Sequence, residues 1–391
     1  MTTYNFDREI DRKKTNSLKY DFAVERGRDV DVLPLWVADM DFQAPKPVLD
    51  ALQNAVSHGI FGYSEVKGEY FDALYRWFDS RFDWQPKSEW LVKTPGVVFA
   101  LAMAVRALTK EGDSVLIQPP VYYPFFEVIR DNNRKIVESP LLLTDGHYEI
   151  DFDDLEEKIA SQNVKLFLLC SPHNPVGRVW TKEELQKLGE LCDRYHVFVV
   201  ADEIHCDFTY PGHKHYVFAS LDPQFLMNTV TCTSPSKTFN LAGLQVSNIF
   251  IPNLKMKKKF EKAVAQTGYS QLNLFGLVAC KAAYEFGDIW LKELKLYLIQ
   301  NLDYIRNFLK NELPLVSLIE PEGTYLVWLD FRKLNLSEEK LEKLIVEKAG
   351  LWLDSGKMFG IEGVGFQRIN IACPISILEK ALFKLKEALL S

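Results

Sequence analysis

The feature that most constrains the fold is a series of short apolar runs between residues 90 and 252, separated by amphipathic stretches. The runs are Ser114–Gln118, Lys165–Cys170, Val197–Ala201, Thr229–Thr233 and Val246–Ile251. They are brief, rich in β-branched residues and apolar at several consecutive positions, which is typical of strands covered on both faces. Such strands need helices on either side of the sheet. We therefore expect an α/β unit of three layers (αβα) with a mostly parallel sheet.

Two amphipathic stretches in this region predict helices. Thr181 and Glu184 have the spacing of a capping box, and apolar residues follow them at helical intervals up to residue 196. A second helix is expected to begin just after Pro95 and Gly96, with Phe99 on its apolar face. Strand and helix then alternate as an α/β fold requires.

The pattern changes at about Tyr284, and the remaining elements predict a smaller α+β unit. In order, they are a helix over Trp290–Leu309, a strand over Tyr325–Asp330, a helix over 337–349, a strand over Phe366–Ala372 and a final helix. A chain of 391 residues is long for one core. We predict a large domain at 45–283 and a small domain made of 1–44 and 284–391. The polar N-terminal segment is expected to pack on the small domain or to reach a partner subunit.

Charge and composition exclude several function classes. The net charge of −7 argues against broad nucleic-acid binding, and the basic run at 254–262 predicts a solvated helix face. No apolar run approaches the roughly 20 residues that span a bilayer, and the polar N-terminus shows no signal peptide. The six cysteines contain no CxxC pair, which favours a reducing compartment. We expect a cytoplasmic protein with neither nucleic-acid nor membrane partners.

A metal site is not expected, although four potential ligands lie close together in the sequence. They are His205, Cys206, His213 and His215. Their spacing matches no common ligand pattern, so a polar loop is the preferred interpretation.

Three short polar segments follow predicted strands, where ligands collect in α/β sheets. They are SPHNPVG (Ser171–Gly177), ADEIH (Ala201–His205) and SPSKTFNLAG (Ser234–Gly243). Taken singly, each has a structural explanation: a strand-end aspartate often caps a turn, and HNPVG reads as a turn. Together they resemble the cofactor site of the fold-type I pyridoxal-phosphate (PLP) enzymes of the aspartate aminotransferase superfamily, and the resemblance covers nearly the whole chain.

The resemblance implies a role for one residue in each segment. Lys237 would condense with the cofactor aldehyde and later move the α-proton of the substrate. Asp202 would stay ionised beside the pyridine nitrogen and keep that nitrogen protonated. Asn174 would lie beside the phenolic oxygen of the ring. His205 occupies the position where many relatives carry a tyrosine, and we include it among the cofactor-binding candidates.

The phosphate group is expected at a helix N-terminus. The backbone of Gly96, Val97 and Val98 begins such a helix, and the hydroxyls of Ser234 and Ser236 flank the lysine. Many aminotransferases follow the lysine segment with a glycine and, two residues later, an arginine that contacts the phosphate. Here a glutamine, residue 245, stands in place of that arginine.

Five strings resemble one subgroup, the MalY/PatB-type cystathionine β-lyases, or C–S lyases. They are LPLWVADMDF (Leu33–Phe42), FGYSEVKG (Phe61–Gly68), QPPVYYPF (Gln118–Phe125), ADEIH and SKTFNLAGLQVSN. The departures at positions 205 and 245 are normal for this subgroup. The resemblance implies that Tyr122 stacks on the cofactor ring and that Tyr123 assists proton transfer or orients the substrate. Tyr63 would reach the phosphate of a neighbouring subunit's site in a homodimer. Arg368 would clamp the substrate carboxylate in a bidentate manner.

The reaction implied is α,β-elimination of an amino acid that carries a thiolate leaving group on Cβ. Lys237 removes the Cα proton, the thiol or hydrogen sulfide leaves, and the remainder is released as pyruvate and ammonia. Cystathionine would give homocysteine, and cysteine would give hydrogen sulfide. An aminotransferase needs the same lysine, aspartate, asparagine and arginine and remains the alternative enzyme. A regulatory binding protein that keeps the fold is an alternative from another class.

Overall fold

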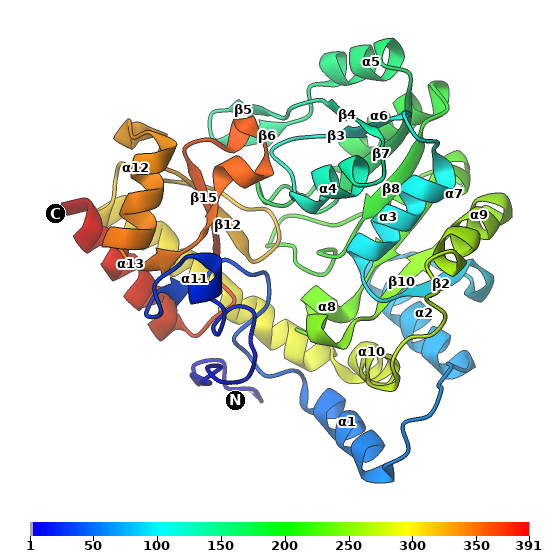
Figure 1. Ribbon diagram of the computed structural model, residues 1–391, viewed down its shortest axis with the longest axis horizontal. Coiled ribbons are helices and arrows are strands. Elements are labelled where there is room, and N and C mark those ends of the chain that lie inside the picture. Colours follow the sequence, from blue (N-terminus) through cyan, green and yellow to red (C-terminus); the bar gives the residue numbers. More distant parts are fainter. Residues whose placement is uncertain (1–2, 391) are drawn as a thin grey trace.

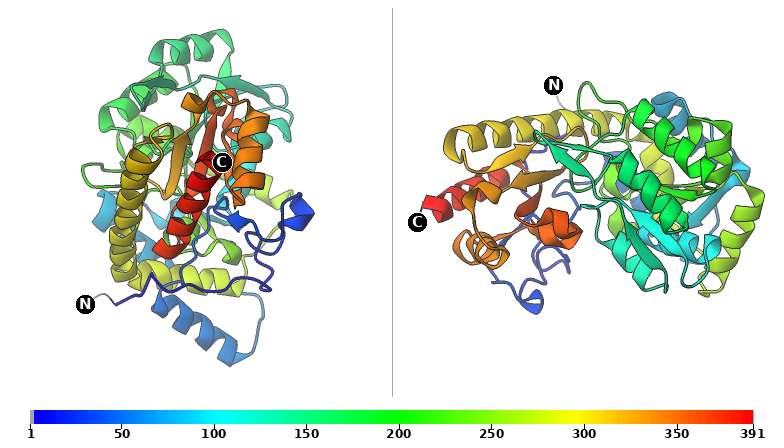
Figure 2. Two further views of the ribbon diagram at one scale, coloured as in Figure 1. Left: turned by 90° about the vertical axis from the view of Figure 1, so that its left-hand side faces the viewer. Right: turned by 90° about the horizontal axis from the view of Figure 1, so that it is seen from above.

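The computed structural model describes residues 3–390 as a larger α/β unit and a smaller α+β unit joined by a long helix (Figure 1). Figure 2 shows the larger unit beside the smaller one, with helix α11 (Asp288–Glu312) running along the smaller unit. No helix among residues 3–390 is both long enough and apolar enough to span a bilayer.

The larger unit is built on a seven-stranded sheet. Its strands, in spatial order, are β2 (Leu91–Thr94), β10 (Ser247–Phe250), β9 (Thr229–Thr233), β8 (Phe198–Asp202), β7 (Val164–Cys170), β3 (Ser114–Ile117) and β4 (Lys135–Glu138). Only β10 runs antiparallel to its neighbours, and the pairs from β9 to β4 are parallel. The predicted mostly parallel sheet is confirmed.

Helices cover both faces of this sheet, which explains the continuous apolar runs. Along β7, Leu166 and Leu168 pack with one group of helices, whereas Phe167 and Leu169 pack with the other. The first face is covered by α3 (Val97–Leu108), α4 (Pro124–Arg130) and α9 (Leu254–Ala265). The second is covered by α5 (Phe152–Ser161), α6 (Lys182–Arg194), α7 (Pro223–Asn228), α2 (Gly68–Phe82) and α10 (Leu274–Phe286). Side chains alternate across a strand, so a strand buried on both sides is apolar at every position.

The smaller unit holds a four-stranded antiparallel sheet in the order β11-β12-β15-β14. The strands are β11 (Ser317–Ile319), β12 (Leu326–Asp330), β15 (Phe366–Asn370) and β14 (Asp354–Ser355). Its helices are α11, α12 (Glu338–Lys343) and α13 (Ile375–Leu390). The helix expected over 337–349 becomes a π-helical turn at Leu344–Lys348 after α12.

The N-terminal segment packs on the smaller unit. Strand β1 (Leu33–Pro34) pairs in parallel with β13 (Leu351–Trp352). The Tyr297 hydroxyl on α11 donates to the Asp7 carboxylate at 2.8 Å. Helix α1 (Lys46–His58) then packs against α10 at the edge of the larger unit. We propose that the two units are domains with the boundaries expected from the sequence, 45–283 and 1–44 with 284–391.

The remaining elements are short. They are the hairpin β5 (Leu142–Thr144) and β6 (His147–Glu149), helix α8 (Pro235–Thr238), and the 3-10 turns η1 (Val24–Arg26), η2 (Ser88–Trp90), η3 (Phe218–Ser220), η4 (Ala242–Leu244), η5 (Arg332–Leu334), η7 (Gly356–Phe359) and η8 (Ile361–Gly363).

Candidate active site

The polar segments singled out from the sequence meet at one edge of the large sheet. Asp202, the last residue of β8, is paired in register with Cys170 on one side and with Cys232 on the other. The three strands are parallel, so their carboxyl ends lie side by side and the loops that follow them converge. This places Asn174 and Lys237 in the segments that follow β7 and β9, on either side of Asp202 at the end of β8.

Lys237 lies on α8, a helix of a single turn. Ser234 caps this helix by accepting a hydrogen bond from the backbone N–H of Ser236 at 3.1 Å. The next residue, Thr238, donates its hydroxyl to the buried carboxylate of Asp207 at 2.8 Å. These two contacts fix the backbone of Lys237. Burial lowers the pKa of its amine to about 8, although Asp39 and Asp202 partly oppose the shift. The neutral form of this amine is therefore far more populated near neutral pH than that of an ordinary lysine.

The Asp202 carboxylate is buried and poorly compensated. It accepts one hydrogen bond, from the backbone N–H of Ile204 at 3.2 Å. No described lysine, arginine or histidine forms an ion pair with it. Burial raises its pKa to about 7, against the effects of Ile204 and Lys237. A buried carboxylate of this kind gains free energy from any cationic donor placed beside it.

Arg368 joins the smaller unit to the site. It lies on β15, and its guanidinium donates to the Asn174 side-chain oxygen at 2.9 Å and to the Trp36 carbonyl at 2.9 Å. The same guanidinium forms an ion pair with Asp354, which is opposite Arg368 in the β14–β15 register. Both side chains are 3% exposed, so the pair holds a charge in the interior that would otherwise be costly.

The aromatic residues of the QPPVYYPF string border the same region. The Tyr122 backbone N–H donates to the Asn174 carbonyl at 3.0 Å. The rings of Tyr122 and Tyr123 lie 5.2 Å apart between centroids. Burial raises the pKa of both phenols, so both are neutral near pH 7. His205 is also buried, near Tyr325, and burial lowers its pKa well below the ordinary value.

The expected phosphate-binding groups are brought together by strand pairing. Thr94 and Ser247 are partners in the β2–β10 register, so the start of α3 lies beside the beginning of β10. The Ser234 hydroxyl donates to the Val246 carbonyl at 2.7 Å and bonds to the Ser236 hydroxyl at 2.8 Å. Gly96 precedes α3 in an extended conformation, and an added Cβ there would meet nothing within 4 Å. The backbone N–H groups of the first helical turn are therefore available to an anion.

Tyr63 is the one candidate that this chain does not bring to the site. It lies on the loop between α1 and α2 and is 97% exposed. It makes no hydrogen bond and no ring contact with another described residue.

The family of this chain is clear from its similarity to known proteins. The model of the family described as aminotransferase class I and II matches residues 30–385. The chain belongs to this family. It is 45% identical over 385 residues to the cystathionine beta-lyase PatB of Bacillus subtilis, with 98% of this chain and 100% of PatB covered. It is 33% identical to the protein MalY of Escherichia coli over 99% of both chains.

A solved structure points to the same subgroup of the aminotransferase class I and II family. The PLP-bound C–S lyase of Staphylococcus hominis superposes with a TM-score of 0.93 at 36% identity, covering 100% of this chain and 99% of the other. The resemblance to MalY/PatB-type cystathionine β-lyases drawn from the sequence is confirmed.

Sequence reasoning missed how the WVADMDF string takes part in this aminotransferase-type site. Much of the segment 36–42 is held through its backbone carbonyls. Lys237 Nζ and the Tyr325 hydroxyl both donate to the Ala38 carbonyl, at 2.8 and 3.0 Å. The side-chain amide of Asn370 donates to the carbonyls of Val37 and Asp39, and that of Asn240 donates to two further carbonyls, those of residues 40 and 42. The segment connects the lysine loop of one unit with the arginine strand of the other.

Charged side chains fix the outer part of this segment. Arg12 binds Asp39 at 2.8 Å and Asp41 at 2.7 Å, and Lys19 binds Asp41 at 2.7 Å. Lys19 is fully buried. Moving the segment would break these ion pairs and leave a charge without a partner in the interior, which is costly. The cluster therefore holds the segment in place.

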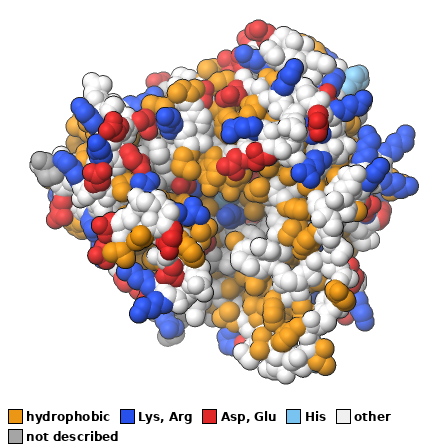
Figure 3. All heavy atoms as spheres, viewed as in Figure 1, with side chains coloured by type: hydrophobic (Ala, Val, Ile, Leu, Met, Phe, Trp, Pro, Cys, Tyr) orange, Lys and Arg blue, Asp and Glu red, His pale blue; other side chains and the backbone are white. Residues whose placement is uncertain are grey.

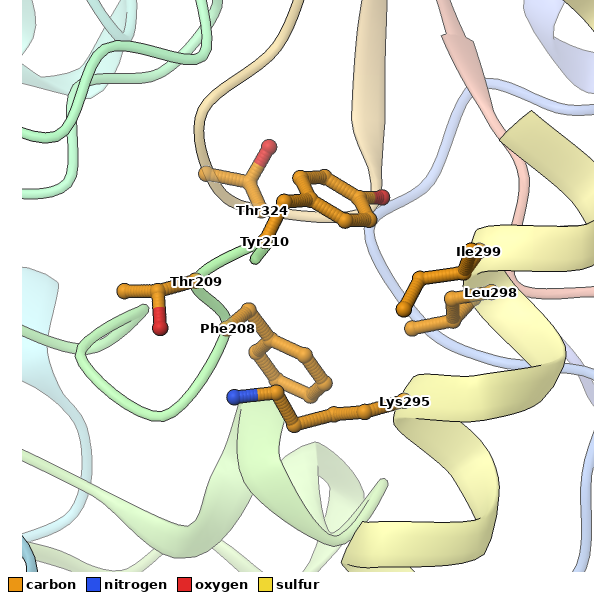
Figure 4. Close-up of a pocket in the computed structure, with 7 residues that line it drawn as sticks. All are labelled: Phe208, Thr209, Tyr210, Lys295, Leu298, Ile299 and Thr324. Carbon is orange, nitrogen blue, oxygen red and sulfur yellow. The ribbon is translucent and has the colours of Figure 1, made fainter. Parts of the chain in front are cut away.

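A small cavity beside α11 is too small for a substrate. It lies between the segment Phe208–Tyr210 and α11, with Lys295 extending along it (Figure 4). Its volume is about 10 Å³, which is room for roughly one water molecule. Burial lowers the pKa of Lys295, while Asp207 opposes the shift.

Proposed function

We propose that this protein is a PLP-dependent carbon–sulfur β-lyase that acts on cysteine and S-substituted cysteines such as cystathionine. One observation carries the proposal: an amine with a lowered pKa, on Lys237, and a carboxylate with a raised pKa, on Asp202, lie near the carboxyl ends of the adjacent strands β9 and β8. Paired groups whose environments shift their pKa values in this way are characteristic of catalytic centres.

The residues present fit the cofactor. Asp202 has no cationic partner among the described residues, and a protonated pyridine nitrogen would supply one. Asn174 accepts from Arg368 through its side-chain oxygen, which leaves its amide group to donate to the phenolic oxygen of the cofactor. Tyr122 would stack on the ring, and His205 would lie at its edge as a neutral imidazole. The start of α3 together with Ser234 and Ser236 would hold the phosphate.

Each remaining step is assigned to a side chain of the protein. Arg368 binds the substrate α-carboxylate through its planar fork of donors. Lys237, with its lowered pKa, accepts the proton from the substrate Cα. Tyr123 lies beside Tyr122 and orients the substrate or passes a proton to the departing sulfur. When bound, the cofactor supplies an electron sink for the charge that develops at Cα.

The products follow from loss of the sulfur substituent. The bond between Cβ and sulfur breaks, the sulfur leaves as a thiol, and the amino-acid remainder is hydrolysed to pyruvate and ammonia. Cystathionine yields homocysteine, and cysteine yields hydrogen sulfide.

A product assay tests this proposal. Purified protein loaded with PLP is given cystathionine, cysteine and S-methylcysteine, with Lys237→Ala as the control. We expect pyruvate from wild type and none above background from the variant. A loaded enzyme that makes no pyruvate but exchanges the amino group in proportion to added keto acid would instead be an aminotransferase, and the lyase proposal would fail.

The assembly that completes this site is a homodimer. Apolar side chains gather on α1 and on the loop that follows it (Figure 3). The exposed residues are Leu49, Val56, Ile60, Phe61 and Tyr63. A patch of this kind marks an interface, and a second copy that covers it would receive Tyr63 at its phosphate site. We place the dimer in the cytoplasm, since all six cysteines are free and buried.

A further inference from the structure

A groove with a volume of about 350 Å³ lies next to the candidate active site, between α4 and the turn η7. One wall is the face of α4 that carries Tyr123, Phe126, Glu127 and Arg130, which recur at helical spacing. The other wall is the η7 turn of the smaller unit, with Lys357, Met358 and Gly360. The groove therefore lies where the two units meet.

The two walls are fixed with respect to each other. The backbone N–H of Val121 donates to the Phe359 carbonyl at 2.9 Å, which ties the start of α4 to η7. Gly360 has φ +124°, and an added Cβ would lie 2.9 Å from the Cβ of Pro119. Because residue 360 is a glycine, the turn can approach Pro119, in the loop that follows β3, this closely.

The buried ring of Phe359 separates the groove from the proposed carboxylate clamp, Arg368. The Arg368 guanidinium lies 4.9 Å from the ring centroid of Phe359, and this ring lies 6.0 Å from that of Tyr123. Tyr123 lines the groove itself. Tyr123 thus borders both the candidate active site and the groove, and a long substrate held by Arg368 would reach the groove along this ring.

The charged side chains that line the groove have no partner among the described residues. Glu127, Arg130 and Lys357 are exposed, and none forms a hydrogen bond through its side chain or an ion pair with another described residue. The groove thus offers two cationic groups and one anionic group to a ligand.

We infer that this groove is a subsite for the far end of a thioether substrate that carries a second amino-acid group. An α-carboxylate would be bound by Arg130 and Lys357, and an α-ammonium group by Glu127. Cystathionine has both groups on its leaving half, whereas cysteine and simple S-alkylcysteines have neither. The inference rests on the proposed lyase function and ranks diamino-acid thioethers above simple S-alkylcysteines as substrates.

The test compares cystathionine with S-butylcysteine, which has a similar length but no charged far end. Pyruvate formation is measured for wild type, for Arg130→Gln combined with Lys357→Gln, and for Glu127→Gln. Lys258→Gln, on the exposed face of α9, is the matched control. The double variant should raise KM for cystathionine and lower kcat/KM about three- to tenfold, with S-butylcysteine changed less than about twofold. Added salt should shrink the preference of wild type for cystathionine.

Two outcomes overturn the inference: an equal loss for both substrates, or no change for cystathionine in any groove variant. If wild type makes no pyruvate from either substrate, the lyase proposal fails separately. Calorimetric titration of the loaded protein with the same two compounds then still tests whether the groove binds the far end of cystathionine. Weaker binding of cystathionine alone to the double variant supports it, and unchanged binding contradicts it.

Discussion

The Nζ atom of Lys237 donates a hydrogen bond to the backbone carbonyl of Ala38 at 2.8 Å, although the two residues are 199 positions apart in the chain. This bond links the lysine loop of the large sheet to the N-terminal segment that also receives Arg368. The acceptor is neutral, so it orients the amine without adding a counter-charge, and burial is left to dominate its pKa.

The lowered pKa of Lys237 predicts how the cofactor-free protein takes up PLP at different pH values. Only the neutral amine attacks an aldehyde, and the neutral fraction grows as the pH rises through about 8 instead of the ordinary 10.5. The rate of loading, followed by absorbance at a fixed PLP concentration, should therefore rise with a midpoint near pH 8. A midpoint close to the ordinary lysine value would show that the amine is not buried as described.

The raised pKa of Asp202 predicts that this residue destabilises the cofactor-free protein at neutral and alkaline pH. The folded state holds a proton on Asp202 up to about pH 7, whereas the unfolded chain releases it near 3.8. Between these values the folded state binds more protons, so the free energy of unfolding falls as the pH rises. Asp202→Asn should be more stable than wild type at pH 8, by about 4 kcal/mol at most, and the gain should vanish near pH 4.

The measurement for Asp202→Asn is urea unfolding of the cofactor-free proteins across this pH range. With PLP bound, the order of stability should reverse. The carboxylate of wild type then pairs with the protonated pyridine nitrogen of the cofactor, whereas the neutral amide of the variant cannot form this ion pair. A variant that is no more stable than wild type at pH 8 would count against an uncompensated buried carboxylate.

The geometry of Arg368 predicts that a lysine cannot replace it. Arg368→Lys keeps a positive charge beside Asp354 but loses the planar fork that reaches the Asn174 oxygen and the substrate. We expect kcat/KM for S-methylcysteine to fall by about tenfold or more, mainly through KM, because a hydrogen bond to a charged group is lost. Steady-state kinetics measure this, with the cofactor absorbance band as a check on loading. Kinetics equal to those of wild type would remove Arg368 from the substrate site.

The exposed apolar loop after α1 predicts the oligomeric state. Ile60 and Phe61 are 69% and 61% exposed in the single chain. Replacing both with aspartate should convert a dimer into monomers and weaken PLP binding, because Tyr63 no longer reaches the neighbouring site. Leu254→Asp, at a residue 63% exposed on α9, is the control and should leave the dimer intact. Sedimentation of wild type as a monomer would contradict this assembly.

The sequence predicted the parts of the molecule that have a local signature. Strand β9 was expected over Thr229–Thr233 and has those bounds, and the Thr181–Glu184 capping box forms as its spacing indicates. Strand ends are visible in a sequence because polar residues follow apolar runs. Asn174, Asp202 and Lys237 could be proposed for that reason.

The contacts that hold these residues are not visible in the sequence. Asp354 lies on a two-residue strand and gives no sign that it pairs with Arg368 until β14 and β15 are placed side by side. The WVADMDF string was recognised, but its role depends on backbone carbonyls, which every residue type provides. Asn240 and Asn370, which bind those carbonyls, come from different units of the fold. Contacts between residues that lie hundreds of positions apart can be predicted only when the topology of the fold is known.

The most direct test of the account is to locate the covalent link between protein and cofactor. The PLP-loaded protein is reduced with borohydride, digested and mapped by mass spectrometry. We expect one modified residue, Lys237, and no modification of the Lys237→Ala variant under the same conditions. A link on any other lysine, or a wild-type protein that carries no cofactor after reduction, would contradict it.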